Sequence, residues 1–214
     1  MDIFNEISEL FCIDFPKGYS YEAVEAAKKQ MGGMPKLLEQ FYLRFGCSDE
    51  LNRLQDFLIL PNKYPIFAEA DYLVFFNENQ GVCQAGIHKK SLSNPNPPVY
   101  VSNDDGNWIK SSDFLSEFLI AMFGYQASIC LEHAPSEFYW VTAEEKKQIG
   151  TFFPKRKESL KMWIGHEISL YGSNNHARIA LMEAYGYIQL NYAANNIHDF
   201  EEMRKLLQNI GEVI

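Results

Sequence analysis

Histidines are the side chains best suited to bind a metal or to move a proton at neutral pH, so their spacing is a first test for chemistry. A zinc site needs ligands at short, characteristic separations, and the histidines of this chain match none of them. His166 and Glu167, for example, lack the second histidine of a zinc-protease helix. We therefore predict no metal site around the histidines, which stand at His88, His133, His166, His176 and His198.

The segment from Asn103 to Asn107 carries the carboxylate and amide oxygens that calcium prefers. A calcium loop also needs a later glutamate, and the sequence lacks one at the required position. Asp105-Gly106 tolerates the positive φ of hairpin turns. The segment is therefore predicted to be a tight turn between strands.

Nucleophilic catalysis would require a serine or cysteine beside a base. The chain has no Gly-x-Ser-x-Gly elbow, no phosphate-binding Gly-x-x-x-x-Gly-Lys loop and no Cys-x-x-Cys pair. Cys83 has no neighbouring histidine to activate its thiol, which favours a core role. We predict no catalytic residue and no cofactor, so the expected protein is not an enzyme.

Composition narrows the classes of partner. The 214 residues are 47% hydrophobic, which excludes a disordered protein. With 19 Lys and Arg against 28 Asp and Glu, the net charge of -9 disfavours nucleic acid and anionic membranes and favours basic partners, although acidity also simply promotes solubility. The N-terminal segment lacks a secretory signal pattern and no apolar run is long enough to span a membrane, so we expect a cytoplasmic protein.

Acidic residues and large aromatics are the candidates for binding a protein partner. The acids fall mostly at loops and element ends, where they would form one negative surface or a scattered solvated set. Trp108, Trp140 and the aromatic stretch with Tyr185, Tyr187 and Tyr192 are possible anchors, with core packing as the alternative. The predicted partner-binding set is Asp49, Glu50, Asp56, Glu69, Asp71, Glu78, Asp104, Asp105 and Trp108.

The elements that would position these residues centre on a hairpin. Residues 72–76 are apolar on both alternating faces, which predicts a central strand, and 82–87 is predicted to return antiparallel to it. The other expectations are helices over 20–31, 35–45 and about 114–122, a strand over 99–102, a capping box at Thr142 and Glu145, a basic connector over 152–157, strands over 177–182 and 185–192, a bulge at Gly186 and a last helix over 199–209.

This order of elements predicts the α+β class. No repeat or low-complexity linker divides the chain, so we predict one domain over 1–214, with a core over about 20–130 and a strand–helix extension over about 131–214.

Several ordered features resemble one family. The Met34-Pro35 helix with Phe41, Tyr42, Phe45 and Gly46 is similar to the Leu-Pro-x-x-hydrophobic-x-x-Phe-Tyr-x-x-x-Gly opening of the Smi1/Knr4 (SUKH) superfamily. The segments 78–83, 86–87 and 97–101, followed by Trp108, resemble its bacterial branch. The resemblance covers roughly 34–122. It departs at Cys47, where a second glycine is usual, and at Gln84-Ala85, where a bulkier pair is usual.

The resemblance implies an α+β fold with a bent, mainly antiparallel sheet flanked by helices, and a role in protein binding without catalytic residues. Bacterial members look like immunity proteins that neutralise a delivered toxin, often a nuclease, while fungal relatives regulate cell-wall glucan synthesis. Our first hypothesis is an immunity protein that binds a basic toxin domain. A regulatory or scaffold protein is the second, and an enzyme with a pocket formed by Asp71, Glu78 and a histidine is the third. The oligomeric state stays open.

Overall fold

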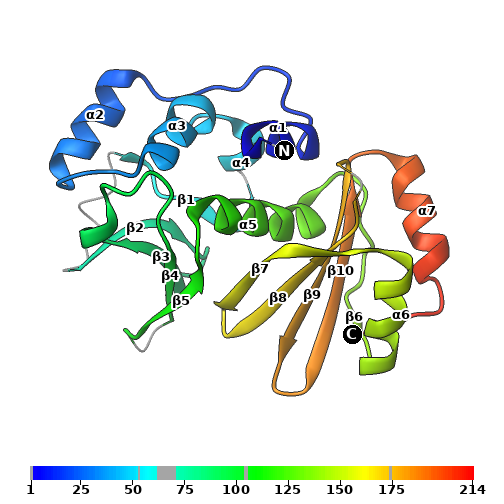
Figure 1. Ribbon diagram of the computed structural model, residues 1–214. Helices are drawn as coiled ribbons and strands as arrows, with labels where there is room; N and C mark the ends of the chain where they lie inside the picture. The colour runs from blue at the N-terminus through cyan, green and yellow to red at the C-terminus, as the bar shows by residue number, and fades with distance from the viewer. Residues whose placement is uncertain (1, 53, 62–70, 104–105, 174) are drawn as a thin grey trace. The chain divides into compact units, whose positions relative to one another are not determined.

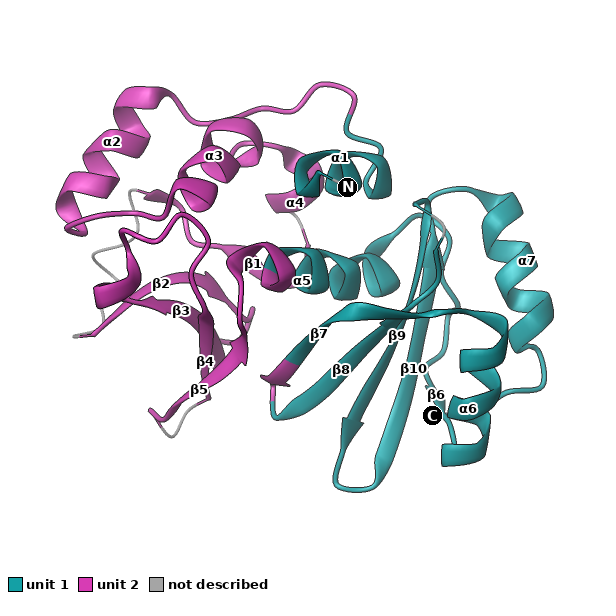
Figure 2. Cartoon of the chain, viewed as in Figure 1, with its two compact units in different colours: residues 1–13, 119–160, 165–214 teal, residues 14–118, 161–164 magenta. Residues whose placement is uncertain are grey.

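The computed structural model describes residues 2–52, 54–61, 71–103, 106–173 and 175–214 (Figure 1). The chain divides into two compact units (Figure 2). Unit 1 comprises Met1–Ile13, Leu119–Leu160 and Gly165–Ile214, and unit 2 comprises Asp14–Phe118 and Lys161–Ile164. Two compact units need not fold separately, so the expectation of one domain over 1–214 stays a prediction.

Unit 2 begins with helices whose ends follow the predicted signals. Its helices are α2 (Tyr21–Gln30), α3 (Lys36–Phe45), the short α4 (Asp49–Asn52) and the 3₁₀ turn η2 (Lys89–Ser91). Ser20 caps α2 by accepting a hydrogen bond from the N–H of Ala23 at 3.3 Å. Pro35 is the N-cap of α3, one position before the one expected for it.

The sheet of unit 2 is an antiparallel meander in the order β1-β2-β3-β4-β5. Its strands are β1 (Phe57–Leu58), β2 (Tyr72–Asn77), β3 (Cys83–His88), β4 (Val99–Asn103) and β5 (Trp108–Ser112). Residues 73–76 are fully buried, which confirms β2 as an interior strand of the sheet. On the core side, Phe75 and Phe76 contact the ring of Phe118, and Phe76 also contacts Trp163.

Unit 1 combines the N-terminal helix with helices from the second half of the chain. They are α1 (Ile3–Leu10), α6 (Ala143–Phe152) and α7 (Ile197–Leu207), together with most of α5 (Leu115–Cys130). The predicted capping box is present: the N–H of Glu145 donates to Oγ1 of Thr142 at 3.2 Å, and the N–H of Thr142 donates to the Glu145 carboxylate at 2.7 Å. The boundary between the units falls within α5 and within β7.

The second sheet has the order β11-β6-β10-β9-β8-β7. Its strands are β6 (Tyr139–Trp140), β7 (Lys155–Trp163), β8 (His166–Tyr171), β9 (Ala177–Ala184), β10 (Tyr187–Ala194) and β11 (Glu212–Val213). Strands β9 and β10 were predicted. The prediction of a basic connector over 152–157 is wrong, because β7 begins at Lys155. Strand β8 was not predicted. Gly186 is not a bulge: Ala184 pairs with Tyr187, so Tyr185 and Gly186, both with positive φ, form a two-residue turn.

One face of this second sheet packs against α6 and α7. Their contacts form a core of side chains from the sheet, including Ile179 and Leu181, and from the helices, including Ile149, Met203 and Leu207. Helices packed on antiparallel sheets confirm the predicted α+β class, and the strands among the described residues form one sheet of five and one of six. In the described part of the chain, no helix combines the length and the apolar character needed to cross a membrane.

Candidate interaction surfaces

Four half-buried rings form an aromatic cluster on the sheet of unit 2, which we call the first aromatic surface: Tyr72 (β2), His88 (β3), Tyr100 (β4) and Trp108 (β5). Tyr72 lies at its centre. Its ring stacks on Trp108 with centroids 4.1 Å apart and an interplanar angle of 12°, and it meets Tyr100 and His88 edge-on at 5.6 and 5.2 Å. Such geometries are favourable for aromatic pairs beyond their area of burial.

The strand register and one glycine create this arrangement. Trp108 pairs with Ser102 and Gly86 pairs with Tyr100, so the indole reaches across two strands to Tyr72. A Cβ on Gly86 would lie 2.8 Å from two carbon atoms of the Trp108 ring. Only glycine therefore leaves room for the indole over β3. The sequence singled out Trp108 but not this dependence on Gly86.

Charged side chains border the first aromatic surface. Exposed Asp71 immediately precedes β2, and Lys110, opposite Tyr100 on β5, pairs with Asp113 at 2.6 Å. Partial burial raises the pKa of Tyr72 above its ordinary value, and the nearby Tyr100 and Asp71 raise it further. An aromatic centre with a charged edge is the usual anatomy of a protein-binding hot spot.

A second aromatic surface lies in unit 1 and consists of Trp140 (β6) and Tyr187 (β10), with Tyr185 in the turn just before β10. The rings of Trp140 and Tyr187 are 5.5 Å apart. These side chains are 39% (Trp140), 95% (Tyr185) and 64% (Tyr187) exposed. Tyr192, proposed with them as an anchor, instead stacks on Phe200 and is buried. The second surface is thus more exposed than the first and less fixed by neighbouring rings.

The predicted acidic set divides into three groups. Asp49, Glu50 and Asp71 are exposed as expected. Glu69, Asp104 and Asp105 lie outside the described residues. Asp56 and Glu78 are buried and so do not belong to an exposed acidic surface, which corrects the expectation for both. Of the three exposed acids of this set, Asp71 is the one that adjoins a strand of the first aromatic surface.

Asp56 and Glu78 are buried because the fold supplies donors to their carboxylates. Glu78 accepts hydrogen bonds from the N–H groups of Gln80 and Val82, at 2.9 and 3.2 Å, and thereby holds the β2–β3 turn. Asp56 accepts one from the indole of Trp163 at 2.8 Å. These donors offset the cost of burying both acids, since a buried carboxylate needs such hydrogen bonds.

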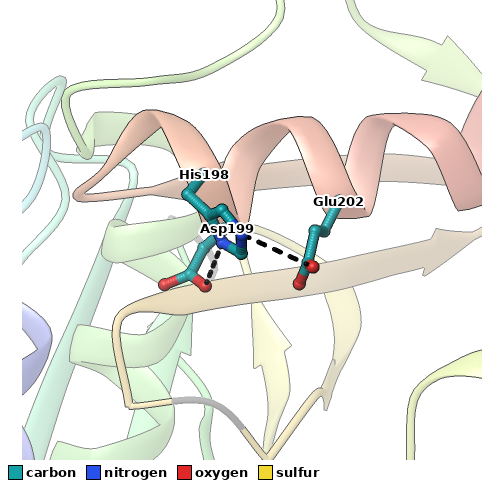
Figure 3. A group of neighbouring side chains, drawn as sticks. All are labelled: His198, Asp199 and Glu202. Atoms are coloured by element: carbon teal, nitrogen blue, oxygen red, sulfur yellow. Dashed lines mark ion pairs between the residues drawn. The ribbon is translucent and has the colours of Figure 1, made fainter.

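Within the described chain, His198, Asp199 and Glu202 form a group whose possible metal-binding atoms all lie within 4.8 Å of one another (Figure 3). The imidazole is 3.8 Å from Asp199 and 3.7 Å from Glu202, which are ion-pair distances. Asp199 also accepts a hydrogen bond from the Asn196 side chain at 2.7 Å, as part of the α7 cap. The group therefore resembles helix-surface pairing, and the expectation of no metal site stays a prediction.

Cys83 is buried, and burial raises the pKa of its thiol to about 12. The thiol is accordingly protonated at neutral pH and is not an activated nucleophile. This agrees with the core role expected for it.

Comparison with known proteins does not assign this chain to a family. No family model matches the chain, and neither a curated protein nor a solved structure does.

Proposed function

We propose that this chain is a non-catalytic protein-binding module that acts in the cytoplasm as an immunity protein, neutralising a bacterial toxin with a basic domain such as a nuclease. The observation that carries the proposal is the stacked pair of Tyr72 and Trp108, held half-exposed over Gly86 with Asp71 beside it. The similarity of residues 34–122 to the SUKH superfamily supports the same role.

The physical argument has two parts. Rings already fixed by packing lose little conformational entropy on binding, so they suit a tight interface. The net charge of -9 would accelerate encounter with a basic toxin, because a nuclease must present positive charge to hold phosphate. Catalysis is not required, since covering the toxin's active site would suffice.

Co-expression with the toxin encoded beside this chain tests the proposal, and we expect growth to be rescued. Trp108→Ala should weaken the isolated complex by about 2 kcal/mol or more, roughly thirtyfold in affinity. Trp140→Ala is the matched control, because it removes the same side chain from the second aromatic surface. Circular dichroism and thermal melts establish that both variants fold.

Failure of every neighbouring gene product to be neutralised would overturn the immunity role. Recovery of an endogenous protein partner from the chain's own cells, with that failure, would favour the regulatory or scaffold role instead. Loss of rescue in Trp140→Ala but not in Trp108→Ala would move the interface to the second aromatic surface.

A further inference from the structure

Unit 1 contains a cavity of about 760 Å³ that neither aromatic surface includes. It lies between the loop that leads into β6, the later turns of α7 and the chain that follows α7. We call it the Tyr192 cavity, after a tyrosine of β10 that lines it. Sites for free small molecules usually measure about 300–1,000 Å³, so the cavity has the size of such a site.

Aromatic rings form one wall of the Tyr192 cavity. The ring of Tyr192 lies nearly parallel to that of Phe200, with centroids 5.9 Å apart and an interplanar angle of 19°. The ring of Tyr139 follows at 6.4 Å from Tyr192 and 33°. Leu207 and Ile210, both buried, extend the apolar lining. Because Phe200 and Tyr139 are only half-buried, a further ring can pack against them at the centroid distances of ordinary aromatic pairs.

The hydroxyl of Tyr192 has no hydrogen-bond partner among the residues that the structure describes, although this tyrosine is only 5% exposed. Polar groups buried so deeply normally have a partner. Three groups act on the pKa of this tyrosine besides burial, and all of them line the same cavity: Tyr139, Arg204 and Glu201. The hydroxyl therefore lies at the cavity wall. Burial raises its pKa to about 12, so it is protonated at neutral pH and can donate a hydrogen bond into the cavity.

The charged side chains that line the Tyr192 cavity compensate one another. Arg204 pairs with Glu201 at 2.9 Å. Glu137 accepts a hydrogen bond from the Ser136 hydroxyl at 2.7 Å, and its charge is matched by that of Lys205. The lining thus carries two acids and two bases, and it offers a charged ligand no net attraction. The buried hydroxyl is then the polar group that selects a ligand.

We propose that the Tyr192 cavity binds an uncharged aromatic molecule that carries a hydrogen-bond acceptor such as a carbonyl oxygen. The ring of this molecule packs against Tyr139 and Phe200, and its acceptor meets the hydroxyl of Tyr192. Apolar and aromatic walls with a few placed polar groups are the usual lining of a small-molecule site. The site goes beyond the proposed function, because it gives the chain a small-molecule ligand in addition to a protein partner.

Titration of the isotope-labelled full chain with benzamide, followed by nuclear magnetic resonance, tests the proposal. Two analogues each change one feature: benzoate replaces the neutral amide with an anion, and cyclohexanecarboxamide keeps the amide but lacks the aromatic ring. We expect benzamide to cause saturable shifts in the amide signals of α7 and of residues 134–139 and 210–213, with the millimolar affinity of so small a probe. Both analogues should bind about two- to tenfold more weakly, since one buries an unpaired charge and the other loses ring packing.

Tyr192→Phe removes the hydroxyl and keeps the ring, so it should weaken benzamide binding about three- to tenfold, as expected for one hydrogen bond. Tyr171→Phe is the matched control and should leave the affinity unchanged, because Tyr171 is similarly buried in unit 1 but does not line this cavity. Phe200→Leu should reduce the preference for benzamide over cyclohexanecarboxamide. Circular dichroism establishes that the variants fold, and the comparison of analogues on the parent chain stands even where a variant does not.

Absence of saturable shifts at the Tyr192 cavity, equal affinity of benzamide and its two analogues, or equal affinity of Tyr192→Phe and Tyr171→Phe for benzamide would overturn the proposal. These results would leave the proposed function standing, because toxin neutralisation and the Trp108→Ala test depend on the first aromatic surface in unit 2.

Discussion

The indole Nε1 of Trp163 donates a hydrogen bond of 2.8 Å to Oδ2 of Asp56, and both side chains are buried within unit 2. Oδ1 of Asp56 accepts from the N–H of Asn79 at 3.4 Å. The indole bond joins residues 107 positions apart, so it fixes the end of β7 to the segment that leads into β1. Asp56 acts here as a structural acceptor.

Trp163→Phe should destabilise the protein by about 1–3 kcal/mol, because a buried carboxylate loses a donor. Urea denaturation followed by circular dichroism measures this loss. Exposed Trp140→Phe is the control and should change stability by less than about 0.5 kcal/mol. Equal losses in the two variants would contradict a structural role for the Asp56 bond.

Local signals account for the parts of the fold that the sequence predicted. The capping box of α6 depends on Thr142 and Glu145, three positions apart, and the hairpin of β2 and β3 depends on two apolar runs around a polar turn. Both signals are complete within a short segment. They can therefore be identified before any tertiary contact is known.

Strand β7 was missed because its inward positions include charges. Glu158 is buried and Arg156 is half-buried. Arg156 pairs with Glu158 in the same strand and with Glu6, which lies far away in the sequence. Alternation of apolar and polar residues is consequently hidden, and the segment reads as a basic connector. Only the fold supplies the pairing that makes such burial tolerable.

The candidate site shows the same limit. Trp108 was predicted as an anchor from its residue type alone, but its stacking on Tyr72 depends on strand register and on the missing side chain of Gly86. The burial of Asp56 likewise depends on Trp163, far along the chain. Composition cannot distinguish an acid at the surface from one with a distant donor.

Glu6→Gln should destabilise unit 1 by about 3 kcal/mol or more, because the carboxylate neutralises two guanidinium groups in the interior. The midpoint of urea denaturation measures the effect. Glu9→Gln provides the control on the same helix: Glu9 is exposed and accepts a hydrogen bond of 2.6 Å from Asn175, so its loss should cost under about 0.5 kcal/mol. A similar small cost for Glu6→Gln would show that the ion pairs of Glu6 with Arg156 and Arg178 do not hold α1 in place.

Alkaline pH should destabilise the protein through Cys83. Burial raises the pKa of this thiol from 9.0 to about 12, whereas the unfolded chain loses the proton near pH 9. Between these pH values the folded state binds more protons than the unfolded state. The stabilisation that comes from the protonated thiol is therefore complete below pH 9 and is lost by about pH 12. The loss amounts to at most about 4 kcal/mol for a shift of this size.

Cys83→Ala should therefore flatten the dependence of unfolding free energy on pH between 9 and 12. Denaturant unfolding at several pH values measures the slope, and titration of the other groups cancels when variant and parent are compared. Exposed Cys12→Ala should leave the slope as in the parent. Parallel slopes for Cys83→Ala and the parent would contradict the argument from burial.

The same change at two glycines should have opposite effects. Gly86→Ala would place a Cβ 2.8 Å from the Trp108 ring and should cost about 1–3 kcal/mol, since the indole must move. Gly150→Ala in α6 meets only an ordinary contact, 3.9 Å from Tyr171, and should gain about 0.5–1 kcal/mol through helix propensity. Thermal and urea unfolding give both values, and near-ultraviolet circular dichroism reports the tryptophan environment.

In the Trp108→Ala background the cost of Gly86→Ala should largely disappear, because the space above β3 is then open. If that cost persists there, the strain lies in the backbone of β3, and the first aromatic surface does not depend on this glycine.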